Sequence, residues 1–491
     1  MTNNSTEQSS NTDKPSAGSR LVGDKTTSLI FFIVCMTNIT INLDHGIIPA
    51  CTKEIMSDMN IGEVDLGLLG SLVYGGLIAG SILGTVVFTK FTAKSIILIA
   101  GVGNVLSLAI FPLSKSMFLL SISRILTGFF QVFFCIYFPV WVDLHGKEKR
   151  TRWLTILQVG VPLGVFLGYG ITALLVKYIH WIYAYFIQIV ILGSCVVGFA
   201  FFGSDRLSTV DLKSTALMTL DMDSEDQYLP AITTSSFLGP DSSQSSDYSL
   251  LDDNPQVNEG EAGSPSKKPR GGLRKHFKAL MKNEIYRFSL LALTSLYFIV
   301  TGIQFWISDY MRSVLKMEKE IVFISYAFLT LSAPVTGVIV GGIITDKRGG
   351  YTSKEAHDFV IFFGVLSALS GLPIPFLDNF YLVCGFLWLE LFFGGGIMPA
   401  ITGIMISSVP KNMRAMGNSV AQLFSNALGY FPSPFVYGFV IDRTGGSESR
   451  WGMILLAAWA FWGVLGGVLA RKAKKKFILT LGDINTLGLV Q

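Results

Sequence analysis

Charged residues are scarce in this chain. Lys, Arg, Asp and Glu together make up 15% of its 491 residues, whereas 50% are hydrophobic, and a soluble protein carries about 25% charged residues to cover its surface. The mean hydropathy of +0.52 points the same way. This scarcity excludes a soluble globular protein and indicates a chain that lies largely within a membrane.

Paired cysteines and catalytic motifs are also missing. The five cysteines lie in or beside apolar segments without paired spacing, so neither a disulfide framework nor a zinc site is predicted. There is no nucleophile with a base, no metal-ligand spacing and no phosphate loop, and GGG at 394–396 lacks the strand-to-helix context that such a loop needs. We expect no enzyme activity, metal, cofactor or nucleic-acid partner.

Long apolar runs dominate what is present. A helix needs about 20 residues to cross a hydrocarbon core about 30 Å thick, and twelve such windows occur. The sequence therefore predicts an all-α membrane protein with twelve transmembrane helices in two six-helix halves. The expected spans are residues 27–49, 66–89, 95–113, 117–143, 153–176, 182–203, 286–308, 321–344, 357–376, 380–408, 415–441 and 450–470.

Polar segments divide the chain further. Residues 1–26 and 471–491 are expected to be cytoplasmic tails, the first of them disordered, around a first half at 27–203 and a second at 286–470. Lys and Arg gather in the tails, the linker and the loops after even-numbered spans, which places these segments in the cytoplasm by the positive-inside rule.

The linker, residues 204–285, begins acidic and rich in Ser and Asp, which predicts disorder. Within it, Tyr248 to Leu251 matches short tyrosine and dileucine sorting patterns. Sorting adaptors are therefore candidate partners, and a lysosomal or endosomal membrane is favoured over the plasma membrane. After Pro269 the linker turns basic with interleaved apolar residues, as expected of a surface helix that contacts anionic lipid or of an ordinary basic segment beside a span.

Two charges lie inside spans at similar depth. Counting 1.5 Å per residue puts Arg124 about 10 Å below the outer face and Asp44 about 5 Å below it. A charge inside a span costs about 3 kcal/mol on insertion scales, so the two are expected to pair across a polar cavity and to couple transport to protons. The alternative is that Asp44 and Arg124 only lie at the lumenal membrane interface, with the Arg124 side chain extending towards water.

A third charge, Glu390, lies near the middle of its span. It is either a proton or substrate-amine site, or a group satisfied by a neighbour such as Asn418 or Asn426. The substrate cavity is expected to include Arg124, Gln131, Phe134, Glu390 and Asn426, with Phe134 among the aromatic residues that form an apolar wall.

Two halves with a long central loop resemble the major facilitator superfamily. GGIITDKRGG at 341–350 closely resembles the superfamily's loop motif, which implies a gating role for Asp346, Lys347 and Arg348. The corresponding first-half stretch keeps Lys90 and Lys94 as gating candidates. It has Thr89 where the motif has Asp, and topology alone also explains such lysines.

The stretch Arg124-Ile-Leu-Thr-Gly128, with Pro139, Asp143 and the glycines of the fifth span, resembles the Spinster branch of the superfamily. Leu428-Gly429 with Ser433-Pro434 and Gly438 agrees with that pattern. The resemblance implies that Asp44 and Arg124 form a proton-coupled pair. The chain departs from it at Gln131, where a glutamate is common, so either Asp44 alone carries the coupling or the protein is a facilitator.

Taken together, these features predict a secondary transporter of an amphipathic, lipid-derived substrate of lysophospholipid or sphingolipid type. An organic-anion or small-metabolite transporter of the same superfamily is the first alternative, because the eleventh span also resembles organic-anion-transporting polypeptides. A non-transporting membrane receptor or scaffold is the second.

Overall fold

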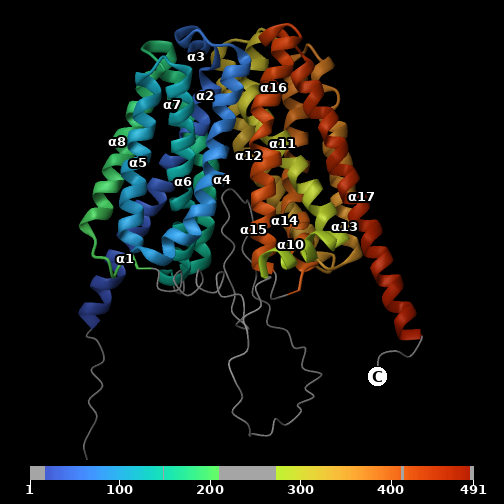
Figure 1. Ribbon diagram of the computed structural model, residues 1–491. Coiled ribbons are helices and arrows are strands. Elements are labelled where there is room, and N and C mark those ends of the chain that lie inside the picture. The colour runs from blue at the N-terminus through green and yellow to red at the C-terminus, as the bar shows by residue number, and fades with distance from the viewer. Residues whose placement is uncertain (1–16, 147–148, 209–271, 411–413, 487–491) are drawn as a thin grey trace, which may run out of the picture.

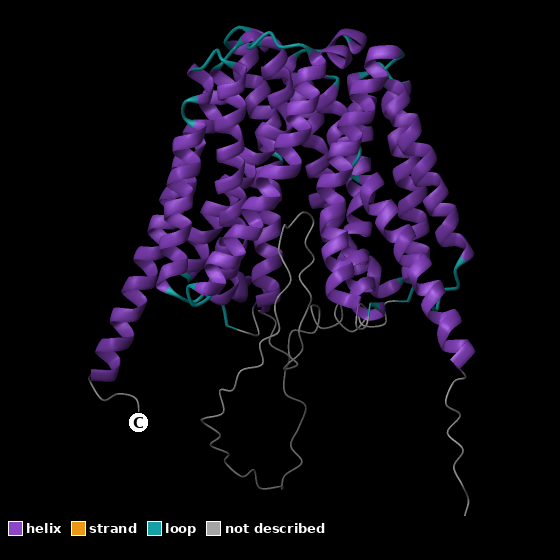
Figure 2. Ribbon diagram, turned by 180° about the vertical axis from the view of Figure 1, so that it is seen from behind, coloured by secondary structure: helices purple, strands orange, loops and turns teal. Residues whose placement is uncertain are grey.

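The computed structural model describes residues 17–146, 149–208, 272–410 and 414–486, and this part of the chain folds into helices without strands. The helices form two bundles that stand side by side (Figures 1 and 2). The first bundle contains α1 (Ala17–Ile41), α2 (Asp44–Ala50), α3 (Thr52–Met59), α4 (Glu63–Lys90), α5 (Ala93–Leu113), α6 (Met117–His145), α7 (Arg150–Tyr178) and α8 (Ile182–Phe201). The second contains α10 (Gly272–Lys282), α11 (Glu284–Ser313), α12 (Lys319–Lys347), α13 (Lys354–Gly371), α14 (Phe380–Ser407), α15 (Arg414–Phe424), α16 (Pro432–Arg443) and α17 (Trp451–Thr486).

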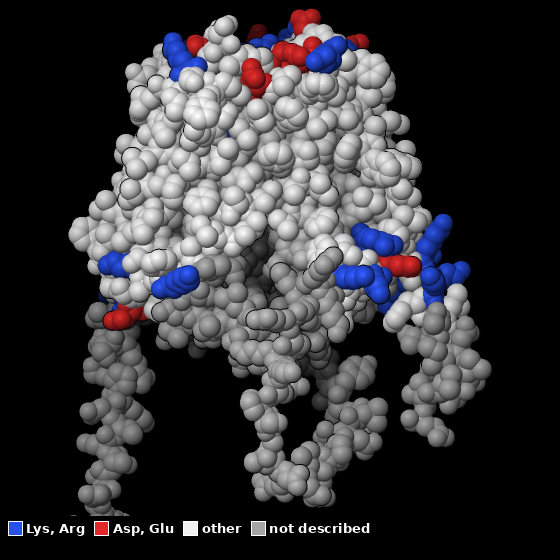
Figure 3. All heavy atoms as spheres, viewed as in Figure 1, with Lys and Arg blue, Asp and Glu red and all other residues white. Residues whose placement is uncertain are grey.

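Eleven helical segments in the described part of the chain are long and apolar enough to cross a membrane. The twelfth expected span, 415–441, consists of α15, a π-helical segment Ser425–Tyr430 and α16. Charged side chains gather at the two ends of the molecule and leave a belt between them (Figure 3). The predicted twelve-span fold in two halves is therefore confirmed.

Two helices extend into the expected tails. The first helix already begins at Ala17, inside the expected tail 1–26, and α17 continues to Thr486, inside the expected tail 471–491. Both helices continue past their apolar windows because polar residues outside the hydrocarbon are compatible with a helix. The basic end of the linker forms the helix α10. Its acidic part, including Tyr248 to Leu251, lies outside the described residues.

The two halves use corresponding helix pairs. In the first half α4 packs along α6 and α5 along α8; in the second, α12 packs along α14 and α13 along α17. These are the second and fourth spans and the third and sixth spans of each half. The correspondence indicates a structural repeat, which is the architecture of transporters that rock one half against the other.

The crossing of α4 and α6 depends on a glycine. A Cβ atom at Gly128 would lie 1.9 Å from the carbonyl oxygen of Val73, so only glycine lets the two backbones approach this closely. The same Gly128 belongs to the motif that begins at Arg124. Packing therefore explains its presence next to the buried arginine.

We expect Gly128→Ala to lower the free energy of unfolding by about 1–3 kcal/mol, the usual cost of overpacking. Gly193→Ala in α8 is the matched control, because a Cβ there has nothing within 4 Å and alanine favours the helix. Thermal unfolding of both variants in detergent measures the difference. Equal melting temperatures would contradict the packing role of Gly128.

Candidate functional site

Arg124 of α6 and Asp44 of α2 form a buried ion pair. The distance from Arg124 Nη1 to Asp44 Oδ2 is 3.1 Å, and the two side chains are 3% and 0% exposed. Arg124 Nε also donates to the carbonyl oxygen of Leu69 at 3.3 Å, and the guanidinium lies 5.5 Å from the ring centre of Phe111. Burial of two charges costs several kcal/mol per ion unless they are paired and hydrogen-bonded. The two charges are here placed to relieve that cost for each other.

A break in the first span positions Asp44. The sequence predicts one span over residues 27–49, whereas α1 ends at Ile41 and α2 begins at Asp44. Helix α7 supports the break, since a Cβ atom at Gly168 would lie 2.0 Å from the carbonyl oxygen of Leu43. Non-helical backbone at membrane depth is tolerated where protein surrounds it or where it lines a cavity. The break therefore directs an acidic side chain into the interior of the first half.

One oxygen of the pair remains available. Asp44 Oδ1 is buried and accepts no hydrogen bond from the described residues. Asp44 borders a side pocket of about 300 Å³ to which Thr301 and Gln304 of α11, in the other half, also contribute. A carboxylate oxygen without a competing donor can accept a proton. The side pocket therefore brings Asp44 of the first half next to residues of the second half.

A larger cavity lies next to this side pocket. The empty space of this cavity, counted out to its opening to solvent, has a volume of about 1730 Å³. Residues of both halves line it. The space-filling view shows the hollow between the halves, opening towards the end where α1 begins and α17 ends, here called the tail face (Figure 3). Most of the wall is apolar. Among the described residues that line it, none is Asp, Glu, Lys or Arg.

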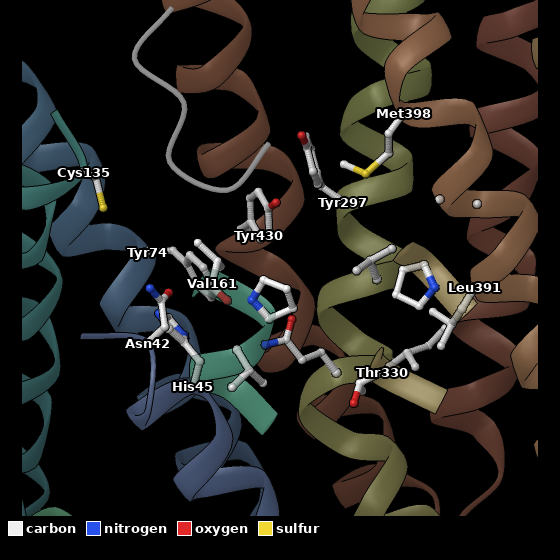
Figure 4. Close-up of a pocket in the computed structure, with 18 of the residues that line it drawn as sticks. Asn42, His45, Tyr74, Cys135, Val161, Tyr297, Thr330, Leu391, Met398 and Tyr430 are labelled. Atoms are coloured by element: carbon white, nitrogen blue, oxygen red, sulfur yellow. The ribbon is translucent and has the colours of Figure 1, made fainter. Parts of the chain in front are cut away.

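A row of aromatic rings crosses the cavity wall from one half to the other. His45 stacks on Tyr74 with ring centres 5.7 Å apart, Tyr74 on Tyr430 at 5.2 Å, and Tyr430 on Tyr297 at 4.5 Å. We call these four residues the aromatic row; all are labelled in Figure 4. The sequence does not predict this row, because its members come from α2, α4, the π-helical segment and α11. The π-helical segment itself is a type of irregularity often found at functional sites.

Three residues separate the ion pair from the cavity. His45, Tyr74 and Gln304 border both the side pocket and the cavity. His45 Nε2 lies 3.5 Å from Gln131 Nε2 on the cavity side. A proton or a conformational signal passing between the ion pair and the cavity would meet these side chains first.

The predicted cavity residues divide into two groups. Gln131 and Asn426 line the cavity, and Arg124 borders the side pocket. Phe134 and Glu390 do not line either space, and that part of the prediction was wrong. Phe134 is fully buried against Phe138, to one side of the stripe that faces the cavity.

Glu390 faces helix α13 instead of the cavity. A Cβ atom at Gly371 would lie 2.6 Å from Glu390 Oε1. On the same helix, Leu387, Leu391 and Gly394 line the cavity; Glu390 lies one position before Leu391, and adjacent residues point about 100° apart at 3.6 residues per turn. Its depth was predicted from the count of residues, but its direction was not.

The predicted gating residues lie at the tail face. Lys90 is exposed at the end of α4, and Asp346, Lys347 and Arg348 are exposed around the end of α12. Lys94 is engaged within the first half, where it donates to the carbonyl oxygens of Ala200 and Phe202 at 3.0 and 2.6 Å. The two halves are apart at this face, so a gate formed by these residues would be open in this conformation. Their gating role remains a prediction.

The halves meet at the opposite end, here called the closed face. Glu54 of α3 accepts hydrogen bonds from both terminal nitrogens of Arg312 at 3.3 and 3.2 Å and from Lys319 at 3.0 Å. Beside them, Thr52 donates to Asp309 at 3.2 Å. Arg312, Asp309 and Lys319 belong to the second half, so these contacts join the halves. We call Glu54, Arg312 and Lys319 the latch.

The charges of the latch control the titration of Glu54. Burial raises the pKa of Glu54, but the hydrogen bond and charge of Arg312 and the charge of Lys319 lower it by more. The pKa of Glu54 therefore lies below its ordinary value, and Glu54 is ionised at neutral pH.

The family profile of the Major Facilitator Superfamily matches residues 27–434, from the first span into α16. The chain belongs to the major facilitator superfamily. Two relatives from Arabidopsis thaliana are called probable sphingolipid transporter spinster homolog 3 and homolog 1. The first is 20% identical over 442 residues, covering 84% of this chain and 79% of that protein. The second is 20% identical over 450 residues, covering 84% and 82%.

Solved structures show the same superfamily fold. A bacterial homologue of the human lysosomal transporter Spinster, in an inward-facing and unoccupied conformation, matches with a TM-score of 0.63 at 12% identity and covers 92% of this chain and 98% of that chain. Its inward-facing and occupied form matches with a TM-score of 0.58 at 13% identity, covering 92% and 97%. The chain is thus a Spinster-like member of the superfamily, a multi-pass membrane transporter and not an enzyme.

Proposed function

We propose that this protein is a proton-coupled secondary transporter of an amphipathic, lipid-derived substrate of lysophospholipid or sphingolipid type, working by alternating access. The observation that carries the proposal is the buried Asp44–Arg124 pair, 3.1 Å apart, beside a large and mainly apolar cavity between the halves. The names of the Arabidopsis relatives support a sphingolipid-like substrate. An organic anion is disfavoured, because the described cavity lining offers no Lys or Arg.

The proposed cycle uses the ion pair as a switch. A proton that reaches Asp44 Oδ1 neutralises the carboxylate and removes its attraction for Arg124, so the guanidinium loses its partner. Loss of that contact changes the wall made by His45, Tyr74 and Gln304, two of which belong to the first half and one to the second. Protonation and movement of the halves are coupled in this way. Because Gln131 does not titrate, Asp44 carries the coupling alone in this scheme.

We assign the tail face to the cytoplasm from the basic residues of its loops and helix ends, so this conformation is open to the cytoplasm. A lysosomal or endosomal membrane fits a transporter driven by an acidic lumen. Sorting adaptors would then read the pattern at Tyr248 to Leu251. Fluorescence microscopy of the tagged full chain with Tyr248→Ala tests this assignment.

Reconstituted vesicles provide the test of transport. Uptake of labelled single-chain lipids (a lysophosphatidylcholine, a sphingosine and a monoacylglycerol) is measured with and without a pH gradient, against empty vesicles. We expect the gradient to speed uptake of at least one lipid severalfold in the wild type and to have no effect in Asp44→Asn, which cannot bind the proton.

Two outcomes contradict the proposal. If no lipid is carried faster than in empty vesicles, the lipid substrate is wrong, and an organic anion or small metabolite is the class to test next. If uptake occurs but Asp44→Asn responds to the gradient as the wild type does, the coupling role of Asp44 is wrong. The melting temperature of Asp44→Asn in detergent confirms that the variant is folded when assayed.

A further inference from the structure

His45 is the described residue of the cavity lining whose side chain can become a cation, since that lining holds no Lys or Arg and no second His (Figure 4). A phosphate group taken out of water needs a positive partner or several hydrogen bonds. Arg124 does not offer itself to the cavity, because it borders only the side pocket and its Nη1 lies 3.1 Å from Asp44 Oδ2. An anionic headgroup in the cavity therefore depends on His45.

His45 faces an amide on the same wall. Its Nε2 lies 3.5 Å from Gln131 Nε2, and both residues line the cavity. A neutral imidazole can accept at Nε2 from the amide, whereas a protonated imidazole donates from both ring nitrogens. In the protonated state two N–H donors would then face each other at 3.5 Å. An anionic oxygen that accepts from both donors removes this conflict, and such charge-assisted hydrogen bonds are the strong ones.

The other end of the Gln131 amide also lacks a partner. Its Oε1 is buried and accepts no hydrogen bond from the described residues, and Gln131 is 3% exposed. A buried amide oxygen without a donor is costly. Lysophospholipids and sphingoid phosphates carry a hydroxyl close to the phosphate. Such a hydroxyl can donate to Oε1 while the phosphate accepts from Nε2 and from His45, so one headgroup satisfies both ends of the amide.

The charges around His45 show when it can hold a proton. Asp44 and Arg124 carry opposite charges and lie 3.1 Å apart, so they leave an imidazolium in the empty cavity without a counter-charge of its own. A bound phosphate supplies that counter-charge. The proton and the phosphate therefore stabilise each other in the cavity, and each favours the binding of the other.

The other titratable groups around His45 do not change charge near neutral pH. The described linings of the cavity and the side pocket contain no Asp, Glu, Lys or Arg besides Asp44 and Arg124. Tyrosines and thiols ordinarily ionise only above about pH 8. These side chains, including one from α8 that acts on the ion pair electrostatically, are Tyr74, Cys135, Tyr185, Tyr297, Tyr326 and Tyr430.

We propose, on the basis of the lipid transport proposed above, that His45 and Gln131 form a phosphate site in the cavity, where a protonated His45 and the Gln131 amide donate to the phosphate of a single-chain lipid. The substrates are then lysophospholipids and sphingoid phosphates, each bound together with one proton at His45. Asp44 keeps its separate role as the switch that moves the halves. A glutamate at position 131 would pair with the imidazolium and repel the phosphate, so the neutral Gln131 leaves His45 available to the headgroup.

Equilibrium binding of radiolabelled lipids to the purified full-length protein tests the proposal at pH 5.5 and pH 7.5. Oleoyl lysophosphatidylglycerol carries a phosphodiester whose charge is the same at both pH values, and monooleoylglycerol has the same chain without phosphate. We expect the lysolipid to bind about tenfold or more tightly at pH 5.5 than at pH 7.5, and monooleoylglycerol to change by less than about twofold. Equal affinity of the lysolipid at both pH values overturns the proposal. An equal change for both lipids also overturns it, because that change would not come from the phosphate.

Two histidine variants provide the matched comparison. His45→Gln keeps an N–H donor but cannot take up a proton, so we expect it to lose the pH response of lysophosphatidylglycerol and to bind this lipid weakly at both pH values. His180→Gln is the control, because His180 lies 3.0 Å from Asp58 at the closed face with 42% of its side chain exposed, away from the cavity lining. It should respond as the wild type does. A pH response that survives in His45→Gln, or that is lost in His180→Gln as well, contradicts the assignment.

Gln131→Glu tests the second residue of the site with almost no change of shape. We expect it to weaken lysophosphatidylglycerol about tenfold at pH 5.5 and to leave monooleoylglycerol within about twofold of the wild type. If Gln131→Glu binds the lysolipid as tightly as the wild type does, the phosphate does not lie between these two side chains and the proposal fails. The melting temperatures of all three variants in detergent show that they are folded when assayed.

Failure of the phosphate site is distinguishable from failure of the proposed function. If lysophosphatidylglycerol does not bind, or binds without the His45-dependent pH response, while any single-chain lipid is carried in vesicles, the protein still transports lipids and only the phosphate site is wrong. If neither probe binds and no lipid is carried, the lipid substrate itself is wrong.

Discussion

Replacing Arg124 by glutamine is expected to lower the free energy of unfolding by about 3–5 kcal/mol and to abolish proton-driven uptake. The reason is that Asp44 is fully buried and would lose its charged partner, which is the costly way to break a buried pair. Arg124 also donates to the carbonyl oxygen of Leu69, and glutamine cannot reach both partners. Thermal unfolding in detergent and vesicle uptake measure the two effects.

The double variant Asp44→Asn with Arg124→Gln separates charge from shape. It removes both buried charges while it keeps side chains of similar size and polarity. We expect it to unfold closer to the wild type than Arg124→Gln does, and to remain without response to a pH gradient. The two single variants and the double variant form a cycle that gives the interaction energy of the pair.

Two results would contradict this account. If Arg124→Gln is as stable as the wild type, the carboxylate is not held in a low-dielectric environment. If the double variant keeps gradient-driven uptake, the coupling proton binds elsewhere. Glu390 is the other buried carboxylate that the sequence singled out, and Glu390→Gln in the same assay would then identify it.

Hydropathy and helical rise were enough to predict the spans and the meeting of Asp44 with Arg124. Both predictions depend only on distance along the chain, which composition and 1.5 Å per residue supply. The direction of a side chain around a helix is a different problem. Phe134 and Glu390 were predicted to face the cavity and do not line it, because their direction depends on which helix packs against which.

The break before Asp44 and the aromatic row could not be predicted for related reasons. A break inside an apolar run changes hydropathy very little, and the contact that supports it comes from α7, more than a hundred residues later. The aromatic row joins four elements of both halves. Residues so far apart in the sequence form no local pattern that would predict their contact. Only the packing of the two halves brings them together.

The second large effect is expected at the closed face. Glu54→Gln should open that face about tenfold more often, because charge-assisted hydrogen bonds are worth about 1.5–3 kcal/mol and partial exposure of the latch reduces this figure. The latch joins the two halves at the closed face only, so breaking it favours the conformation in which the halves are apart at that face. The fraction of molecules that is open at the tail face falls accordingly.

Cys51 is a natural reporter of this opening. The residue is 0% exposed, and its thiol lies within the electrostatic reach of Glu54, Arg312 and Lys319. In a background where the other four cysteines, Cys35, Cys135, Cys195 and Cys384, are replaced by serine or alanine, the rate of labelling by a membrane-impermeant maleimide measures how often the closed face opens.

The labelling rate also depends on the charges near the Cys51 thiol, and a pair of variants separates this effect from the opening of the closed face. Glu54→Gln deletes a negative charge near the thiol and Arg312→Gln deletes a positive one, so their direct effects on thiol reactivity are opposite. Because both break the latch, we expect both to label faster than the background. Opposite changes in labelling would show that only the local charge is being measured. Glu448→Gln is the matched control, since its partner Lys316 belongs to the same half and the pair is exposed.

The titration of Glu54 predicts how the latch responds to acid. Because the pKa of Glu54 is lowered from its ordinary 4.5, the stabilisation that the carboxylate gives the closed face is complete above that ordinary value. It is lost only as the pH falls through the lower pKa of the latched state. The ratio of Cys51 labelling in Glu54→Gln to that in the background should therefore be the same at pH 8 and pH 6. A ratio that falls towards one at pH 6 would mean that Glu54 is already protonated there, and the latch would then be a sensor of luminal acid.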